Sequence, residues 1–308
     1  MATSGSYDVN YTRNELITEA LELAGVIEVG GTATSEQLTS SARTLNMMIK
    51  FWQTQGIALW RNQEIYIFLQ EDTADYTLGP TGTSPATADF TKTEIATAGD
   101  SGDLTITVDS ITGISASDYI GIELDDGTLQ WTGVDGAPSG STVTIVAALT
   151  DDVSVDANVY AYTSGIQRPL FFTELRLHQD SGTEIPLHMM SRNDYKKLST
   201  KTTSGKASQW YYNPLMTDGV LSVWPVANSV KEYLVGTARM PIADFDAAGN
   251  NPDLPQEWLL PLAYNLAVLI APKYDADPGP DFKMMAKMFF DDALESATDY
   301  GSLIIEVE

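Results

Sequence analysis

The composition of the chain changes at about residues 71 and 165, and these two boundaries constrain its fold more than any other feature of the sequence. Residues 71–165 contain 16 acidic residues and one basic residue, Lys92, whereas the other 213 residues contain 26 acidic and 16 basic ones. The same segment is rich in Thr, Ser, Gly, Val and Ile, and short alternating runs are separated by turn dipeptides. This pattern is typical of short antiparallel strands. We therefore expect residues 71–165 to form an inserted all-β module with a solvated acidic surface.

The clearest turn in this segment is Asp126-Gly127, which separates the alternating runs 120–124 and 129–132. An Asp-Gly pair between two such runs favours a β-hairpin. Further strands are expected at 104–108, 142–146, 64–69, 171–178, 184–190, 221–225 and 233–236. Because strands resume after the acidic segment, we expect that segment to interrupt a β subdomain.

The sequence before the acidic segment carries helical signals. Thr12 with Glu15, and Thr34 with Gln37, have the spacing of capping boxes, and each box precedes an apolar stripe of helical period. Glycines 25 and 56 follow these stripes, where a helix commonly ends in a left-handed residue. The pattern predicts two N-terminal helices joined by a loop of about ten residues, which allows them to pack as a hairpin.

Helical periodicity returns near the C-terminus. Pro255 and Pro280 each precede an apolar stripe, and proline suits the first turn of a helix. Pro261 lies inside the first stripe and should kink that helix or delay its start. The expected helices are 12–24, 34–55, 255–271 and 280–299. The predicted fold class is α+β, with a helical bundle from these helices and a β subdomain that carries the acidic module; residues 1–70 and 166–308 form the core, and 71–165 the insert.

The composition excludes several classes of function. The net charge of −25 repels the phosphates of DNA and of anionic membranes. The absence of cysteine removes disulfides, thiolate catalysis and Cys-based metal sites. Residues 1–10 lack the features of a signal peptide, and the most apolar stretch, 258–271, is too short to span a bilayer. We expect a soluble protein made in the cytoplasm.

Residues suited to catalysis are sparse. The two histidines, His178 and His188, have no partner at metal-ligand spacing, and no phosphate-binding loop or nucleophile elbow is present. The acidic pairs at 125–126 and 151–152 lie in turn-rich sequence, which favours solvated loops over a glycosidase pair. We expect no enzyme activity and no catalytic, cofactor-binding or metal-binding residues.

Three segments are candidates for interactions with other molecules. Trp210, Tyr211 and Tyr212 form either a packed core or a stacking platform for a flat ligand. Arg192, Lys196 and Lys197 lie in the most basic stretch of the chain, which is either a solvated loop or a contact with an acidic neighbouring subunit. The apolar C-terminal tail either folds back on its own core or docks into another chain. The tail residues in question are Leu303, Ile304, Ile305 and Val307.

Several short sequence motifs occur in an order that resembles that of one known family. They are Leu45-Asn46-Met47-Met48-Ile49, Gly56-Ile57-x-Leu59-Trp60, Ser191-Arg192-x-Asp194-Tyr195, Trp210-Tyr211-Tyr212, Val223-Trp224-Pro225 and Leu254-Pro255-x-Glu257-Trp258. Their order is similar to that in the head-to-tail adaptor, or connector, proteins of tailed bacteriophages, especially short-tailed ones. The resemblance covers residues 10–80 and 165–300 and leaves the acidic insert outside.

The resemblance implies a structural virion protein located between head and tail. Such adaptors form a ring, usually of twelve copies, beneath the portal protein, and their C-terminal segment grips the portal. Their other face receives the tail nozzle or tail fibres, and DNA passes through the ring without specific binding. For this chain, the implied portal-binding residues are those of the tail, and the basic and aromatic residues named above are candidates for contacts with neighbouring copies or tail proteins.

Two other functions are compatible with the sequence. A carbohydrate- or receptor-binding tail module would use the β insert and the aromatic segment around Trp210. A cell-wall or glycan hydrolase is the second alternative, against which the sparse histidines and the lack of a defined acid pair count. The adaptor is the reading that the residues favour, because it needs no active site and gives the apolar tail a purpose.

Overall fold

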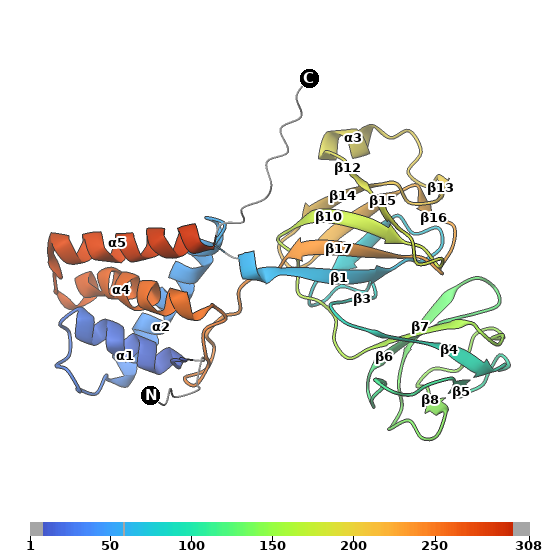
Figure 1. The fold of residues 1–308 in the computed structure, drawn as a ribbon, viewed down its shortest axis with the longest axis horizontal. Coiled ribbons are helices and arrows are strands. Elements are labelled where there is room, and N and C mark those ends of the chain that lie inside the picture. The colour runs from blue at the N-terminus through green and yellow to red at the C-terminus, as the bar shows by residue number, and fades with distance from the viewer. Residues whose placement is uncertain (1–8, 58, 298–308) are drawn as a thin grey trace, which may run out of the picture. The chain divides into compact units, whose positions relative to one another are not determined.

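The computed structural model describes residues 9–57 and 59–297, and the fold is mixed α+β (Figure 1). The chain divides into two compact units, one of residues 1–61 and 241–308 and one of residues 62–240. The first unit is helical. It contains α1 (Arg13–Leu23), α2 (Ser35–Gln53), α4 (Leu259–Ile270), α5 (Gly279–Ser296) and the 3-10 turns η1 (Leu59–Arg61), η2 (Gln256–Trp258) and η3 (Ala271–Tyr274).

The helix boundaries follow the capping signals of the sequence. Thr12 caps α1 and Thr34 caps α2, and both predicted capping boxes are present. Gly25 and Gly56 adopt φ of 71° and 82°, which confirms the predicted left-handed terminators. Pro261 does delay its helix: η2 comes first, and α4 then starts at Leu259 with Pro261 in its first turn.

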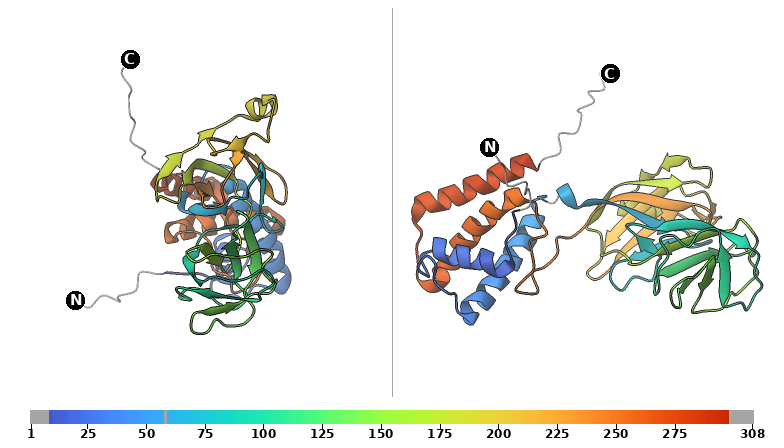
Figure 2. Two further views of the ribbon diagram at one scale, coloured as in Figure 1. Left: turned by 90° about the vertical axis from the view of Figure 1, so that its right-hand side faces the viewer. Right: turned by 60° about the horizontal axis from the view of Figure 1, so that its bottom comes forward.

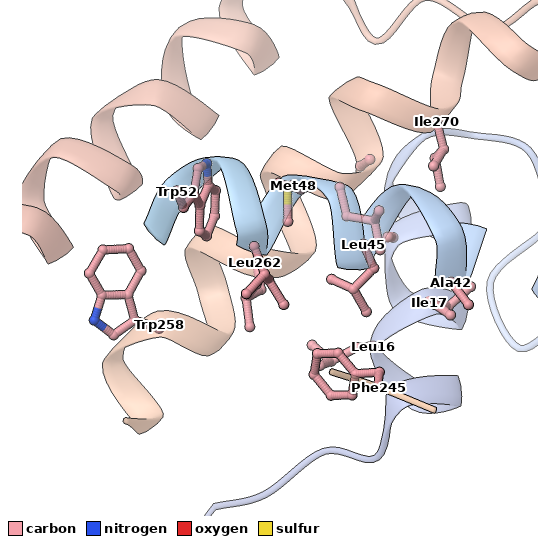
Figure 3. Close-up of a cluster of buried hydrophobic side chains, with 14 of the residues drawn as sticks. Leu16, Ile17, Ala42, Leu45, Met48, Trp52, Phe245, Trp258, Leu262 and Ile270 are labelled. Carbon is pink, nitrogen blue, oxygen red and sulfur yellow. The ribbon is translucent and has the colours of Figure 1, made fainter. Parts of the chain in front are cut away.

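The helical unit is held together by one apolar core to which all four long helices contribute. Figure 3 shows part of this core, with labelled side chains from α1, α2 and α4. Trp258 is its largest fully buried side chain, and its ring lies 5.8 Å from that of Trp52 on α2 and 5.8 Å from that of Phe290 on α5. Leu45 of α2 and Leu262 of α4 are also fully buried. Figure 2 shows α4 and α5 side by side. Helices some 200 residues apart in sequence therefore stabilise one another by burying a common apolar surface.

The second unit consists of strands and one short helix. The strands are β1 (Asn62–Phe68), β2 (Asp75–Leu78), β3 (Ala86–Thr87), β4 (Thr91–Thr97), β5 (Thr105–Val108), β6 (Tyr119–Glu123), β7 (Leu129–Gly133), β8 (Thr142–Thr144), β9 (Asn158–Tyr162), β10 (Phe171–His178), β11 (Glu184–Pro186), β12 (His188–Met189), β13 (Ser204–Gly205), β14 (Gln209–Pro214), β15 (Gly219–Trp224), β16 (Val226–Ala227) and β17 (Tyr233–Arg239), and the helix is α3 (Arg192–Lys197). A five-stranded sheet (β11-β10-β17-β1-β3) and a four-stranded sheet (β12-β14-β15-β2) share one core. The acidic segment supplies the six strands of a separate sheet, β7-β6-β9-β4-β5-β8, with its own core.

The expected Asp126-Gly127 hairpin is present, since β6 and β7 pair antiparallel on either side of it and Gly127 has φ of 85°. The expected strand at 184–190 is wrong as a single element. It is split into β11, in the five-stranded sheet, and β12, in the four-stranded sheet. Between them, Leu187 is buried in the core that the two sheets share, so the chain crosses from one sheet to the other at this residue.

Strand β1 has two apolar faces because it lies between two cores. Ile65 and Ile67 point into the core of the paired sheets, whereas Phe68 belongs to a second cluster on the opposite face. In that cluster the Phe68 ring lies 4.9 Å from Tyr160 of β9 and 5.0 Å from Trp131 of β7. Burial of these rings fixes the six-stranded sheet against the five-stranded one.

A polar contact supports the same junction. Glu123 of β6 is buried, and its carboxylate accepts a hydrogen bond of 2.7 Å from the amide of Asn158 and lies 3.1 Å from the ammonium group of Lys231. The hydrogen bond to Glu123 raises the pKa of Lys231 above its ordinary value. Since Lys231 lies two residues before β17, the ion pair links the acidic segment to the five-stranded sheet.

The buried face of α4 provides a test of the helical core. Leu266 is fully buried, so L266A leaves a cavity and should lower the free energy of unfolding by about 2–5 kcal/mol. Leu269 of the same helix is 48% exposed, so L269A should change it by less than about 0.5 kcal/mol. Urea denaturation followed by the helical circular dichroism signal measures both. Equal losses would contradict this placement of α4.

Candidate functional site

A cleft of about 990 Å³ opens in the second unit, between loop residues 79–85 and the strands β6 and β7. Three aromatic side chains from different strands line it in a row. The Tyr119 ring stacks on that of Tyr162 at 5.2 Å, and the Trp131 ring lies 5.3 Å from Tyr162. Tyr119 is 53% exposed, so the row ends in an accessible ring face.

The position of Trp131 depends on Gly121, which lies opposite it on the neighbouring strand β6. A Cβ atom at Gly121 would lie 2.7 Å from the indole ring, closer than van der Waals contact permits. Glycine at this position therefore lets the indole lie flat across β6. The aromatic row is thus built into the pairing of the two strands.

Polar groups accompany the aromatic row. Asp118 is buried, and one of its carboxylate oxygens accepts a hydrogen bond of 2.7 Å from the backbone of Ser115. The other oxygen, and the indole nitrogen of Trp131, have no hydrogen-bond partner within residues 9–57 and 59–297. The lining of the cleft also includes the polar residues Gln70, Ser117 and Thr132, so the cleft suits a ligand that has both a flat apolar face and hydroxyl groups.

Burial controls the protonation of two tyrosines in this cleft. Burial raises the pKa of Tyr162 to about 12, with a smaller contribution from Tyr119. Burial also raises the pKa of Tyr76 to about 12, although the hydrogen bond with the backbone of Gln70 opposes the shift. Both side chains are therefore neutral hydrogen-bonding groups at physiological pH.

The structure assigns the aromatic residues singled out from sequence to packing. Trp210 is 2% exposed in the core of the paired sheets, and its indole donates to the backbone oxygen of Leu187 at 3.3 Å. This corrects the expectation that Trp210 contacts a partner directly, because its ring is already covered. Tyr211 stacks on Tyr195 of α3 at 5.7 Å, and the Tyr212 hydroxyl donates to the backbone oxygen of Pro169 at 2.6 Å. These rings form no common platform with the cleft.

The basic segment forms the short helix α3, capped by Ser191, whose hydroxyl accepts a hydrogen bond from the backbone of Asp194. Arg192, Lys196 and Lys197 are exposed on this helix. They are accessible to a partner, as an interaction surface requires. The tail residues Leu303, Ile304, Ile305 and Val307 lie outside the described residues.

The carboxylates that the sequence analysis weighed as a glycosidase pair instead accept hydrogen bonds that stabilise loops. Asp125 accepts hydrogen bonds from the backbone and hydroxyl of Ser154. Asp126 accepts from the backbone and hydroxyl of Thr128, and these bonds lower its pKa. His178 stacks on Tyr233 at 4.5 Å. No group of three or more His, Asp or Glu side chains suited to hold a metal occurs in the part of the chain that the structure describes.

The helical unit leaves several large apolar side chains uncovered by its own described residues. On α2, Met47 is 63% exposed and Phe51 61%, and on α5, Met284 is 68% exposed and Met288 49%. Between α1 and α4 an apolar groove of about 500 Å³ is lined by residues that include Tyr11, Leu23, Leu260 and Tyr264. Apolar surface of this kind is characteristic of interfaces with other proteins.

Sequence reasoning missed both the aromatic row and the exposed helix faces. Tyr119, Trp131 and Tyr162 are spread over more than 40 residues, and only the strand pairing brings them together. The helix faces did carry a signal, because Met47 and Phe51 lie four residues apart outside the buried stripe of α2.

No protein-family model matches the chain. No curated protein matches it significantly. Within the residues that the structure covers, no helix combines the length and apolar character needed to cross a bilayer.

The tyrosine pKa values predict sensitivity to alkali. The pKa of Tyr162 is about 12 in the folded chain, compared with 10.0 for an ordinary tyrosine. The neutral side chain therefore contributes its full share to the free energy of unfolding below about pH 10, and this contribution is lost as the pH rises towards 12. Replacing Tyr162 by Phe removes one titrating group, so the decline of unfolding free energy over this range should become shallower. Denaturant titrations of both proteins across this pH range measure it; identical declines would contradict the assigned environment.

Proposed function

We propose that this chain is a structural virion protein, a head-to-tail adaptor that forms a ring between the portal and the tail of a bacteriophage. The observation that carries the proposal is the set of exposed apolar side chains on α2 and α5, together with the apolar groove between α1 and α4. Apolar side chains that gather on helix faces mark interaction sites, and a ring subunit would bury them against its neighbours. The resemblance of the short motifs, in their order along the chain, to those of adaptor proteins supports the same conclusion.

The proposed organisation assigns a role to each part. The N- and C-terminal helices form a bundle that faces the portal and the neighbouring copies. The apolar tail residues Leu303, Ile304, Ile305 and Val307 grip the portal. The acidic β module, inserted into the β subdomain, braces the ring against tail proteins, and the exposed cations Arg192, Lys196 and Lys197 contact an acidic partner there. The net charge of −25 disfavours adhesion of DNA passing through the ring.

Native mass spectrometry of the chain mixed with its cognate portal ring tests the proposal. We expect a discrete complex that contains many copies of the chain per portal ring. Polar substitution of the tail, L303S together with I304S and I305S, should abolish the complex, because burial of the apolar side chains is lost. V29S, which also replaces an exposed apolar residue, is the matched control and should bind normally. Absence of any complex at every salt concentration would contradict the adaptor function.

A second candidate function, glycan binding, is favoured by the aromatic row of the cleft. The exposed ring of Tyr119 offers a face on which a sugar can stack, next to polar groups from the same cleft. This activity is compatible with a tail component that touches the host surface.

Glycan-array binding tests this second function. We expect wild-type protein to bind at least one glycan, and Y119A to lose that binding because the accessible ring face is gone. Y11A, which removes a 41% exposed tyrosine from the helical unit, should bind as wild type does. An array without hits would remove the case for a glycan site.

A further inference from the structure

The outward face of α2 combines apolar and positively charged side chains. Arg43, Met47, Lys50 and Phe51 recur at intervals of three or four residues and are all exposed. Lys50 lies 2.8 Å from Asp244 and also donates a hydrogen bond to the backbone oxygen of Ile242, so its charge is engaged within its own copy. Arg43 is exposed and accessible to a neighbouring copy. Glu36 lies on the same face in the first turn of the helix. The middle and end of this face are therefore apolar and basic.

The outward face of α5 has the opposite charge. Met284 and Met288 lie four residues apart and are exposed, and acidic residues flank them on the same face. These acidic residues are Asp281, Asp291, Asp292 and Glu295, all exposed. The buried residues Ala286 and Ala293 lie on the opposite side of the helix. Lys287, at the edge of the face, is the exception to its acidic character.

We propose that α2 of one copy of this chain packs against α5 of the next copy. Both faces have two large apolar side chains spaced one helical turn apart, so each can bury the other. A chain of net charge −25 repels other copies of itself, and a basic face meeting an acidic one offsets that repulsion locally. The inference rests on the proposed adaptor function and names the contact that builds its ring.

The spacing of the side chains favours an antiparallel arrangement of the two helices. If Met47 lies opposite Met288, then Phe51 lies opposite Met284, because each pair is separated by four residues, or about 6 Å of helix. In the same register Arg43 lies opposite Asp292. Lys50, which is paired with Asp244 in its own copy, lies opposite Met285 and one turn from Asp281, so Arg43 makes the main charge contact in this register.

The contact is heterologous, because α2 and α5 carry different residues. Two α5 faces would bring four acids from each copy together, eight in all, and two α2 faces would lack the acids that pair with Arg43, so neither face pairs well with itself. A heterologous contact repeats from copy to copy and closes into a ring when its rotation allows.

Cross-linking tests this contact sharply, because the chain has no cysteine of its own. M47C and M288C protein, mixed at high concentration and treated with a short bis-maleimide, should give a linked dimer, while either variant alone should not. M216C, whose methionine is 97% exposed in the second unit, sets the background. The double variant M47C/M288C should give a ladder beyond dimer. A mixture at background, or a double variant that stops at dimer, would overturn the proposal.

Charge reversal provides a second readout on folded protein. R43E should reduce linking of the M47C protein to M288C protein by about tenfold or more, because like charges then face one another. D292K in the M288C partner should restore linking, which a merely misfolded variant would not do. Equal yields with and without R43E would contradict the charge pairing. Linking without portal binding would reject the adaptor function alone, and portal binding without linking would reject this contact alone.

Discussion

The pairing of β1 with β17 is the constraint on which the rest of the structure depends. These strands are antiparallel over seven residue pairs, from Asn62 opposite Arg239 to Phe68 opposite Tyr233. Residue 61 directly precedes β1 and residue 241 follows β17 after one intervening residue, and both belong to the helical unit. The pairing therefore closes the loop of nearly 180 residues between them, so that α1 and α2 can share a core with α4 and α5.

The same strand explains how the acidic module is fixed against the five-stranded sheet without disulfide bonds. The alternation of β1 places Ile65 in one core and Phe68 in the other. In the six-stranded sheet, β9 is buried along its whole length, with Val159 in its own core and Tyr160 against Phe68. Two strands with two buried faces thus join the sheets, while most acidic residues of the module, with the exception of the buried Asp118 and Glu123, remain exposed to solvent.

Local signals in the sequence predicted the helices well and the strand partners poorly. Capping boxes at Thr12 and Thr34 and the Asp126-Gly127 turn act over a few residues, so their outcome is readable from the sequence. The strand β9 was missed because it is buried on both faces and so lacks an alternating pattern. The cleft was missed for a related reason, since the register that aligns Tyr119 with Tyr162 is set by pairing across 43 residues.

In the proposed adaptor ring, the two units have different roles. The apolar helix faces of the helical unit form the contacts between copies, and the β sheets of the second unit present surfaces to other virion proteins. Electron cryo-microscopy of the portal ring incubated with this chain tests that account most directly. It predicts an added ring of density in which α2 of each copy lies against α5 of its neighbour. A portal without added density, or a ring whose copies touch only through their β sheets, would contradict it.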